Sequence, residues 1–186
     1  MKRAFDFSMA LIFSFILGFP FFIIFILIKL TSPGPTLYWS KRVGKDNSFF
    51  QMPKFRTMST STPQVATHLL GNSENYLTPL GKVLRKTSLD EIPQLWSILK
   101  GDMSFVGPRP ALYNQGDLVK LRTSSNVEKL LPGLTGWAQI NGRDEISIPE
   151  KVKLDVFYYQ NKSFWFDLKI LFLTVLRVIF QRDISH

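Results

Sequence analysis

A run of apolar residues near the N-terminus constrains the fold of this chain more than any other feature. No charged residue occurs from position 7 to 28, and Lys2, Arg3 and Lys29 flank the run. At about 1.5 Å of rise per residue, a helix of this length can cross a bilayer core of about 30 Å. A cleaved signal peptide fits less well, because the run is long and no small-residue cleavage site follows it. The sequence therefore predicts a membrane segment.

Two features favour a re-entrant helix over a straight span. Gly18 and Pro20 fall in the middle of the run, and proline removes a backbone donor and bends a helix. Lys and Arg occur on both flanks, and cytoplasmic flanks collect these residues, so both ends are expected on one side. We expect residues 1–30 to form a re-entrant helix, broken at Gly18 and Pro20, that enters and leaves the same leaflet. A kinked span stays open as the alternative, because spanning helices tolerate proline.

Charge and composition narrow the classes of partner and cofactor. The 186 residues carry a formal net charge of +9, which indicates an anionic partner such as a nucleic acid, an anionic lipid or a phosphorylated substrate. The chain has no cysteine, so disulfides and thiolate metal sites are excluded. Only His68 and His186 supply imidazole, which disfavours a zinc site or a Ser-His-Asp triad. A metal would be held by oxygen ligands, as Mg²⁺ or Mn²⁺ is.

The remainder, residues 31–186, is predicted to be one compact cytoplasmic domain, so the fold class is α+β and mostly helical. A breaker cluster at 31–35 ends the membrane segment. Expected strands cover 36–39 and 48–51 around a turn at 44–47; expected helices cover 89 or 90–100, 112–131, 149–159 and 164–180; expected loops cover 59–75 and 133–143. The last helix carries Asp167, Lys169 and Arg177, charges that suit an amphipathic interfacial helix or a core helix equally.

Two adjacent acids, Asp90 and Glu91, are the strongest chemical signal. Pro93 lacks an N–H and belongs in the first turn of a helix, which puts both acids near a helix N-terminus. They could simply form caps, with Asp90 or Ser88 at the N-cap and Glu91 completing a capping box. The same position favours an ionised carboxylate, which can attack phosphorus or bind Mg²⁺.

Several cations could neutralise phosphate oxygens beside these acids. Arg85 lies five residues before Asp90, and Arg109 stands between two prolines that restrict its backbone. Lys54 and Arg56 add charge from an earlier segment. Each of these could equally be a solvated surface cation.

A set of motifs spread over almost the whole chain carries a resemblance to a known family. The motifs are Lys2-Arg3-Ala4-Phe5-Asp6, Ser32-Pro33-Gly34-Pro35, Lys54-Phe55-Arg56-Thr57-Met58, Ser88-Leu89-Asp90-Glu91, Lys100-Gly101-Asp102-Met103-Ser104, Val106-Gly107-Pro108-Arg109-Pro110, the run from Pro132 to Arg143, Leu154-Asp155-x-x-Tyr158-x-x-Asn161 and Asp167-Leu168-Lys169-Ile170. With them the chain resembles the bacterial sugar transferases, the monotopic polyprenyl-phosphate phosphoglycosyl transferases. It is similar to their short form, which starts N-linked glycan assembly in Campylobacter-type bacteria.

The resemblance implies a two-step reaction at the cytoplasmic face of the bacterial inner membrane. Asp90 would attack the β-phosphate of a UDP-sugar, expel UMP and pass the sugar phosphate to undecaprenyl phosphate. Glu91 would assist by positioning or proton handling, and Mg²⁺ would bridge Asp90 and the diphosphate. Lys54, Arg85 and Arg109 would bind phosphate. Anionic membrane lipid is an expected partner and nucleic acid is not.

Two details depart from the family pattern or are not determined by it. Family members often have Ser-Pro at the helix break, where this chain has Phe19 before Pro20, so another group must satisfy the freed carbonyl. The short form suggests an N-acetylated deoxy sugar, although no residue selects among sugars. The sequence does not indicate an oligomeric state.

Two alternatives belong to other classes of function. A membrane-tethered module that binds lipid or nucleic acid would use the positive charge, but it would cluster its cations with aromatics and would not need Asp90 and Glu91. A metal-dependent phosphatase or pyrophosphatase would use the same acids and would release free phosphate.

Overall fold

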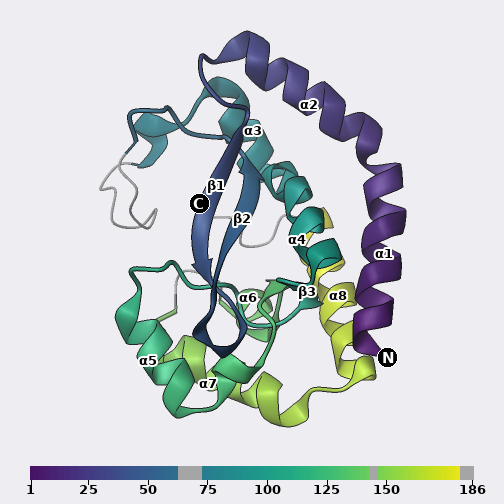
Figure 1. Ribbon diagram of the computed structural model, residues 1–186, viewed down its shortest axis with the longest axis vertical. Coiled ribbons are helices and arrows are strands. Elements are labelled where there is room, and N and C mark those ends of the chain that lie inside the picture. The colour runs from purple at the N-terminus through teal and green to yellow at the C-terminus, as the bar shows by residue number, and fades with distance from the viewer. Residues whose placement is uncertain (63–72, 143–145, 181–186) are drawn as a thin grey trace.

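Helices dominate the computed structural model, which describes residues 1–62, 73–142 and 146–180 (Figure 1). In chain order the elements are α1 (Lys2–Ile16), α2 (Gly18–Thr31), β1 (Leu37–Val43), η1 (Lys45–Asn47), β2 (Phe49–Phe55), η3 (Ser73–Tyr76), α3 (Pro79–Lys86), η4 (Leu89–Gln94), α4 (Leu95–Lys100), β3 (Ser104–Val106), α5 (Gly116–Ser124), η5 (Val127–Lys129), β4 (Gly133–Thr135), α6 (Trp137–Ile140), α7 (Ile148–Asn161) and α8 (Phe164–Ile179). Within these residues, β1 pairs antiparallel with β2, and β3 pairs parallel with β4. The α+β, mostly helical class is confirmed.

The apolar N-terminal segment is a bent pair of helices, α1 and α2, whose axes differ by 59°. The junction is Leu17, one turn before Pro20. Proline clashes with the carbonyl four residues earlier, here that of Ile16, and cannot donate to it, so α1 ends at Ile16. Pro20 itself lies in the first turn of α2, where a missing N–H costs little. Gly18 is helical, and a Cβ there would meet nothing within 4 Å, so crowding does not require glycine.

Neither arm of this pair is a span by itself. Across the described residues, no helix alone has the length and hydropathy needed to cross a bilayer, and only the two arms counted together reach them. Figure 1 shows α1 along one side of the molecule and α2 continuing around its end.

Charged side chains tie the start of α1 to the body of the protein. Lys2 forms an ion pair with Asp167 of α8. The guanidinium of Arg3 donates to the carbonyl of Ile98, and to that of Leu99 at 2.7 Å. These carbonyls are in the last turn of α4, whose free oxygens need donors. Lys2 and Arg3 are therefore structural contacts as well as flanking charges.

The inner side of the bent pair belongs to the hydrophobic core. Asp6 is buried and accepts a hydrogen bond from the backbone N–H of Phe105 in β3. Ala10 of α1 is buried in the main core, and Ile24 and Ile28 of α2 are buried in a second cluster. The main core also contains Met52, Ile98, Met103, Val106 and Ile170; the second also contains Phe55 and Leu84.

The outer side of the pair is an exposed apolar surface. Its large exposed side chains include Phe7, Leu11, Ile12, Phe15, Ile16, Phe19, Phe22, Ile23, Ile26, Leu27 and Leu30. Helix α8 adds Phe172, Val175 and Val178 to the exposed apolar side chains. Contiguous apolar surface of this kind marks a membrane or protein contact.

Several local predictions are confirmed and others are wrong. The hairpin, α7, α8 and the end of α4 at Gly101 match the expected elements, and Gly101 has a left-handed φ of 96°. The expected helix at 112–131 is instead the shorter α5 followed by η5, because Asn126 adopts a left-handed φ of 60° between them. Residues 133–142 are not a plain loop but contain β4 and α6. The predicted loop at 59–75 lies mostly outside the described residues, as do His68, Arg143 and His186.

Candidate active site

Asp90 and Glu91 lie in η4, a single 3₁₀ segment that leads directly into α4. Ser88 precedes it with a left-handed φ of 57°, and no side chain caps the segment. The predicted capping box is therefore wrong. Pro93 closes the 3₁₀ turn as expected near a helix start. Since neither acid is needed as a cap, both side chains are available for other contacts.

Glu91 binds two cationic side chains. Its Oε1 accepts hydrogen bonds from Lys54 Nζ at 2.6 Å and from Arg109 at 3.1 Å. Burial alone would raise the pKa of Glu91, but Lys54 and Arg109 outweigh burial and hold the pKa of this carboxyl well below its usual range. Burial lowers the pKa of Lys54, and Glu91 opposes that shift. Glu91 is therefore a negative charge that orients two cationic side chains.

Asp90 has a different environment although it is the next residue in the chain. It is buried, with 7% of its surface exposed, and its Oδ2 lies 3.9 Å from Lys54 Nζ. Burial raises the pKa of Asp90, while Lys54 and Arg85 favour its ionised form. Burial outweighs the neighbouring cations in the direction of this shift, so the position of Asp90 in η4 does not lower its pKa. Neighbouring carboxyls with pKa values displaced in opposite directions are typical of acids with different chemical roles.

Helix α3 brings Arg85 to the same place. The Nε of Arg85 donates to Thr57 Oγ1 at 3.0 Å, and burial lowers the pKa of Arg85 while Asp90 opposes the shift. The close approach of α3 depends on Gly81, where a Cβ would lie 2.0 Å from the carbonyl oxygen of Thr57. The site thus brings together the two acids of η4 and three cations. The cations are Lys54 of β2, Arg85 of α3 and Arg109 of the segment after β3, which are the residues that the sequence predicted.

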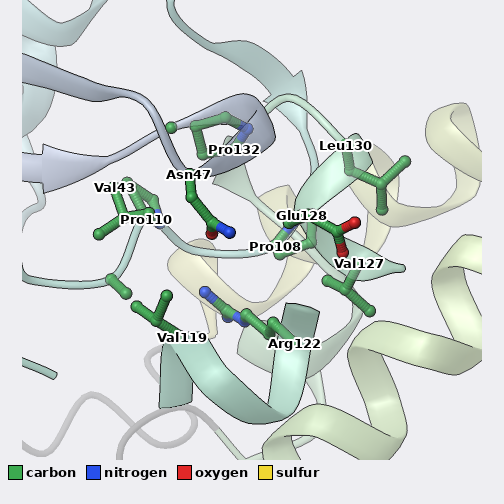
Figure 2. Close-up of a pocket in the computed structure, with 12 residues that line it drawn as sticks. Val43, Asn47, Pro108, Pro110, Val119, Arg122, Val127, Glu128, Leu130 and Pro132 are labelled. Carbon is green, nitrogen blue, oxygen red and sulfur yellow. The ribbon is translucent and has the colours of Figure 1, made fainter. Parts of the chain in front are cut away.

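The backbone that carries Arg109 is held from behind by a buried ion pair. Arg122 of α5 donates from Nη1 to the carbonyl oxygen of Arg109 at 2.8 Å, and from Nη2 to Asp155 Oδ2 of α7 at 2.7 Å. Figure 2 shows Arg122 beside Pro108 and Pro110 at a small cavity of about 30 Å³. Burial raises the pKa of Asp155, and Arg122 opposes that shift.

Arg56 does not join the site, although the sequence suggested that it would add charge there together with Lys54. It is buried and donates to the carbonyl oxygens of Ser32 and Pro33, where the chain leaves α2. Arg56 lies just beyond β2, which ends at Phe55, and its backbone N–H is bonded to Thr36 next to the chain that leaves α2. Arg56 therefore stabilises the connection between the bent pair and the hairpin.

Of the two acids, Asp90 fits a magnesium site that substrate would complete. No three His, Cys, Asp or Glu side chains of residues 1–62, 73–142 and 146–180 are grouped as metal ligands. Mg²⁺ is commonly bound by one or two carboxylates together with substrate phosphates and water. Asp90 suits that role, whereas Glu91 Oε1 is already bonded to Lys54 and Arg109.

Comparison with known proteins gives a consistent result. A family model described as "Bacterial sugar transferase" matches residues 1–181. The chain is 39% identical over 188 residues to the sugar transferase EpsL of Bacillus subtilis, and the match covers 100% of this chain and 91% of EpsL.

Two further relatives have names that specify a sugar. The UDP-glucose:undecaprenyl-phosphate glucose-1-phosphate transferase of Escherichia coli is 38% identical over 95% of this chain and 40% of its own length. The undecaprenyl-phosphate galactose phosphotransferase of Salmonella typhimurium is 35% identical over 98% of this chain and 41% of its own length. The chain therefore spans about two fifths of these two proteins.

Proposed function

The chain belongs to the bacterial sugar transferase family, and from that premise we propose that it moves a sugar 1-phosphate from a UDP-sugar to undecaprenyl phosphate. The reaction releases UMP and leaves the sugar on the lipid through a diphosphate, which starts assembly of a glycoconjugate. Both relatives with sugar-specific names use undecaprenyl phosphate according to those names. Their sugars differ at nearly equal identity, so overall similarity does not select the sugar.

The observation that carries the proposal is the contrast between the two adjacent acids. Glu91 is ionised and holds Lys54 and Arg109, while Asp90 is buried beside the same lysine with a raised pKa. Three cations around one buried carboxyl suit the binding of a diphosphate, whose negative charges they would neutralise.

In the first step an oxygen of ionised Asp90 attacks the β-phosphorus of the UDP-sugar. A bond forms between this oxygen and phosphorus, and the bond from the β-phosphorus to the bridging oxygen breaks, so UMP leaves with the electron pair. Lys54, Arg85 and Arg109 bind the phosphate oxygens and favour the ionised nucleophile. Bound Mg²⁺ would supply further neutralisation of the diphosphate charge.

In the second step the phosphate oxygen of undecaprenyl phosphate attacks the same phosphorus. The bond to Asp90 breaks and the carboxylate is restored, so the enzyme returns unchanged. The sugar phosphate is then joined to the lipid as a diphosphate. Splitting the transfer in this way lets the polar donor and the apolar acceptor use the site in turn.

We propose further that residues 1–30 enter and leave the cytoplasmic leaflet and that residues 31–186 lie on the cytoplasmic face of the inner membrane. Both ends of the bent pair attach to the same body, through Lys2 and Arg3 at the start and through the Arg56 contacts at the end. The exposed apolar sides of the pair and of α8 then face lipid.

A two-stage assay tests the proposed function. With purified protein, Mg²⁺ and a panel of UDP-sugars but no acceptor, one sugar should release UMP in an amount equal to the enzyme. Intact-mass analysis should then show one sugar phosphate, mapped to Asp90. Addition of undecaprenyl phosphate should remove the adduct and give continuous turnover. Release of free phosphate would indicate a phosphatase, and UMP release that requires the lipid to be present first would indicate direct transfer.

A further inference from the structure

A groove between the bent pair and the hairpin is not used by the chemistry described above. It has a volume of about 530 Å³, within the range of about 300–1,000 Å³ typical of small-molecule sites. Phe25 of α2 lines one wall, and Leu37, Tyr38 and Trp39 of β1 line another. The two larger β1 side chains are 41% and 50% exposed, so they present aromatic surface that the fold itself does not bury.

The groove begins next to the site. Tyr38 is the direct partner of Lys54 across the antiparallel β1–β2 pair, and direct partners lie on the same face of the ribbon. Lys54 Nζ is 2.6 Å from Glu91 and 3.9 Å from Asp90. A ligand packed against Tyr38 therefore lies on the same face of the ribbon as Lys54, whereas Leu37 and Trp39 extend the groove along the opposite face of β1.

At its other wall the groove meets the apolar exterior of the bent pair. Phe25 is 37% exposed, and Phe22, Ile26 and Leu30 on the same helix are exposed as well. Lys29 is the charged residue of the lining, and none of the described lining residues is acidic. This combination fits a long apolar chain with an anionic head and does not fit a cationic ligand.

We propose that this groove binds the isoprene units nearest the phosphate of a long-chain polyisoprenyl phosphate. The phosphate points toward Lys54, and the rest of the chain runs along the exposed side of α2. The inference rests on the proposed function, because it names the place of the acceptor in that reaction. A bulk phospholipid does not need to reach Asp90 and Glu91. A nucleotide would place its polar sugar against a mostly apolar wall.

Photolabelling tests the location without turnover. The probe is an undecaprenyl phosphate analogue with a diazirine on the isoprene nearest the phosphate, applied to the full chain in nanodiscs of phosphatidylglycerol and phosphatidylcholine. Label is expected on the tryptic peptide 30–41, which holds Leu37, Tyr38 and Trp39. Unlabelled undecaprenyl phosphate should remove it. Equal protection by added phosphatidylglycerol would overturn the proposal in favour of general lipid contact, and protection by UDP would overturn it in favour of a nucleotide site.

Kinetics with matched variants give a second test. Phe25→Ala and Trp39→Ala should each raise the KM for undecaprenyl phosphate by about fivefold to tenfold. They should leave the single-turnover release of UMP without acceptor unchanged. Phe172→Ala is the control, because this phenylalanine is exposed on α8 and does not line the groove.

The variants should also lose selectivity for chain length. Wild-type protein should use undecaprenyl phosphate more efficiently than a phosphate with two isoprene units, and Trp39→Ala should narrow that difference. An unchanged acceptor KM and chain-length preference in both groove variants would overturn the proposal while the transferase function stood. Label on peptide 30–41 with no UMP release from any UDP-sugar would contradict the transferase function and leave the lipid site.

Discussion

At the scale of single residues, Lys54 contacts both acidic side chains, 2.6 Å from Glu91 and 3.9 Å from Asp90. It cannot neutralise both equally, since its hydrogen bond goes to Glu91. The cations therefore hold the pKa of Glu91 below its usual range, whereas burial raises the pKa of Asp90. One lysine thus gives two neighbouring carboxyls different properties, and the proposed nucleophile, Asp90, is the one that does not accept its hydrogen bond.

Replacement of Asp90 by Asn should abolish the first step. The amide has a similar shape but no nucleophilic charge, so UMP release should fall by at least about a thousandfold, or about 4 kcal/mol of barrier. Circular dichroism and thermal unfolding should be close to wild type. More than a few per cent of wild-type activity in Asp90→Asn would show that this side chain is only a metal ligand or a structural group.

Replacement of Arg109 by Lys keeps the charge but not the planar fork. Arg109 contacts Glu91 at 3.1 Å while its backbone carbonyl is held by Arg122, so the guanidinium has a defined direction. We expect kcat/KM for the donor to fall by about tenfold or more, because lysine cannot grip two phosphate oxygens together. Kinetics equal to wild type would reduce Arg109 to a general source of positive charge.

Asp90 and Glu91 could be predicted from the sequence because their signal is local. Asp90, Glu91 and Pro93 are close in the chain, and Arg109 stands out between prolines. The partner of Glu91 is 37 residues away, and no local pattern indicates that Lys54 joins the site while Arg56 turns to the Ser32–Pro33 exit. The role of Arg122 was missed for the same reason, although Asp155 occurs in a motif that carried the family resemblance.

At the scale of elements, α5 and α7 position the Arg109 segment through one buried pair. The Arg122 and Asp155 side chains are 10% and 2% exposed. Removing one partner of such a pair leaves the other charge buried and is strongly destabilising. The two helices therefore contribute to the site although none of its acids and cations described above lies on them.

Arg122→Met should destabilise the protein by about 3–5 kcal/mol near neutral pH. Without Arg122, the pKa of Asp155 rises further above its value in the unfolded chain. The folded state then holds a proton that the unfolded state releases, so stability falls as pH rises from about 4 through the folded pKa. Urea unfolding should show a larger loss, relative to wild type, at pH 8 than at pH 5.

The matched control for this experiment is Asp155→Asn in the Arg122→Met background. It removes the titrating group, so the difference between pH 5 and pH 8 should disappear. An equal loss of stability at both pH values in Arg122→Met alone would mean that Asp155 does not take up a proton in the folded variant.

Among the elements, those set by local signals were predicted well. Gly101 ends α4 as predicted, and the helix predicted at 149–159 is α7; the capping box of Ser147 and Glu150 that begins α7 was not predicted. The short strands β3 and β4 were missed because each has three residues and exists only by pairing with the other. Helix α5 was predicted too long, because Asn126 adopts a left-handed φ of 60° and separates α5 from η5, which no local pattern indicates.

At the scale of the whole molecule, the bent pair should present its N-terminus to the cytoplasm. Ala4 is exposed and lies between Arg3 and Asp6 without replacing either contact. In this cysteine-free chain, Ala4→Cys should resist a membrane-impermeant thiol reagent in intact spheroplasts and react once the inner membrane is opened. Labelling in intact spheroplasts would show that the pair spans the membrane.

The proline and the contacts to the body can be separated in the same assay. Pro20→Ala restores a backbone donor and removes a clash, together worth about 3 kcal/mol toward a straight helix. We expect its N-terminus to stay inside, because Lys2, Arg3 and Asp6 still bind the body. Asp6→Leu with Pro20→Ala removes one contact while keeping the positive flank, and should increase the labelled fraction. A reversed topology in Pro20→Ala alone would show that the bend depends on the proline.

The attachment of α1 also bears on the order in which the protein can be completed on the ribosome. The partner of Lys2 is Asp167, 165 residues further along the chain, and the partner of Asp6 is Phe105, 99 residues further along. Pairing across such separations is slow, and these groups cannot be satisfied until residues 105 and 167 have been made. The hydrophobic segment is therefore synthesised well before the contacts that fix its place can form. Until α8 has been made, this segment of a nascent chain should stay in lipid or on a chaperone, because its contacts with the catalytic body are still incomplete.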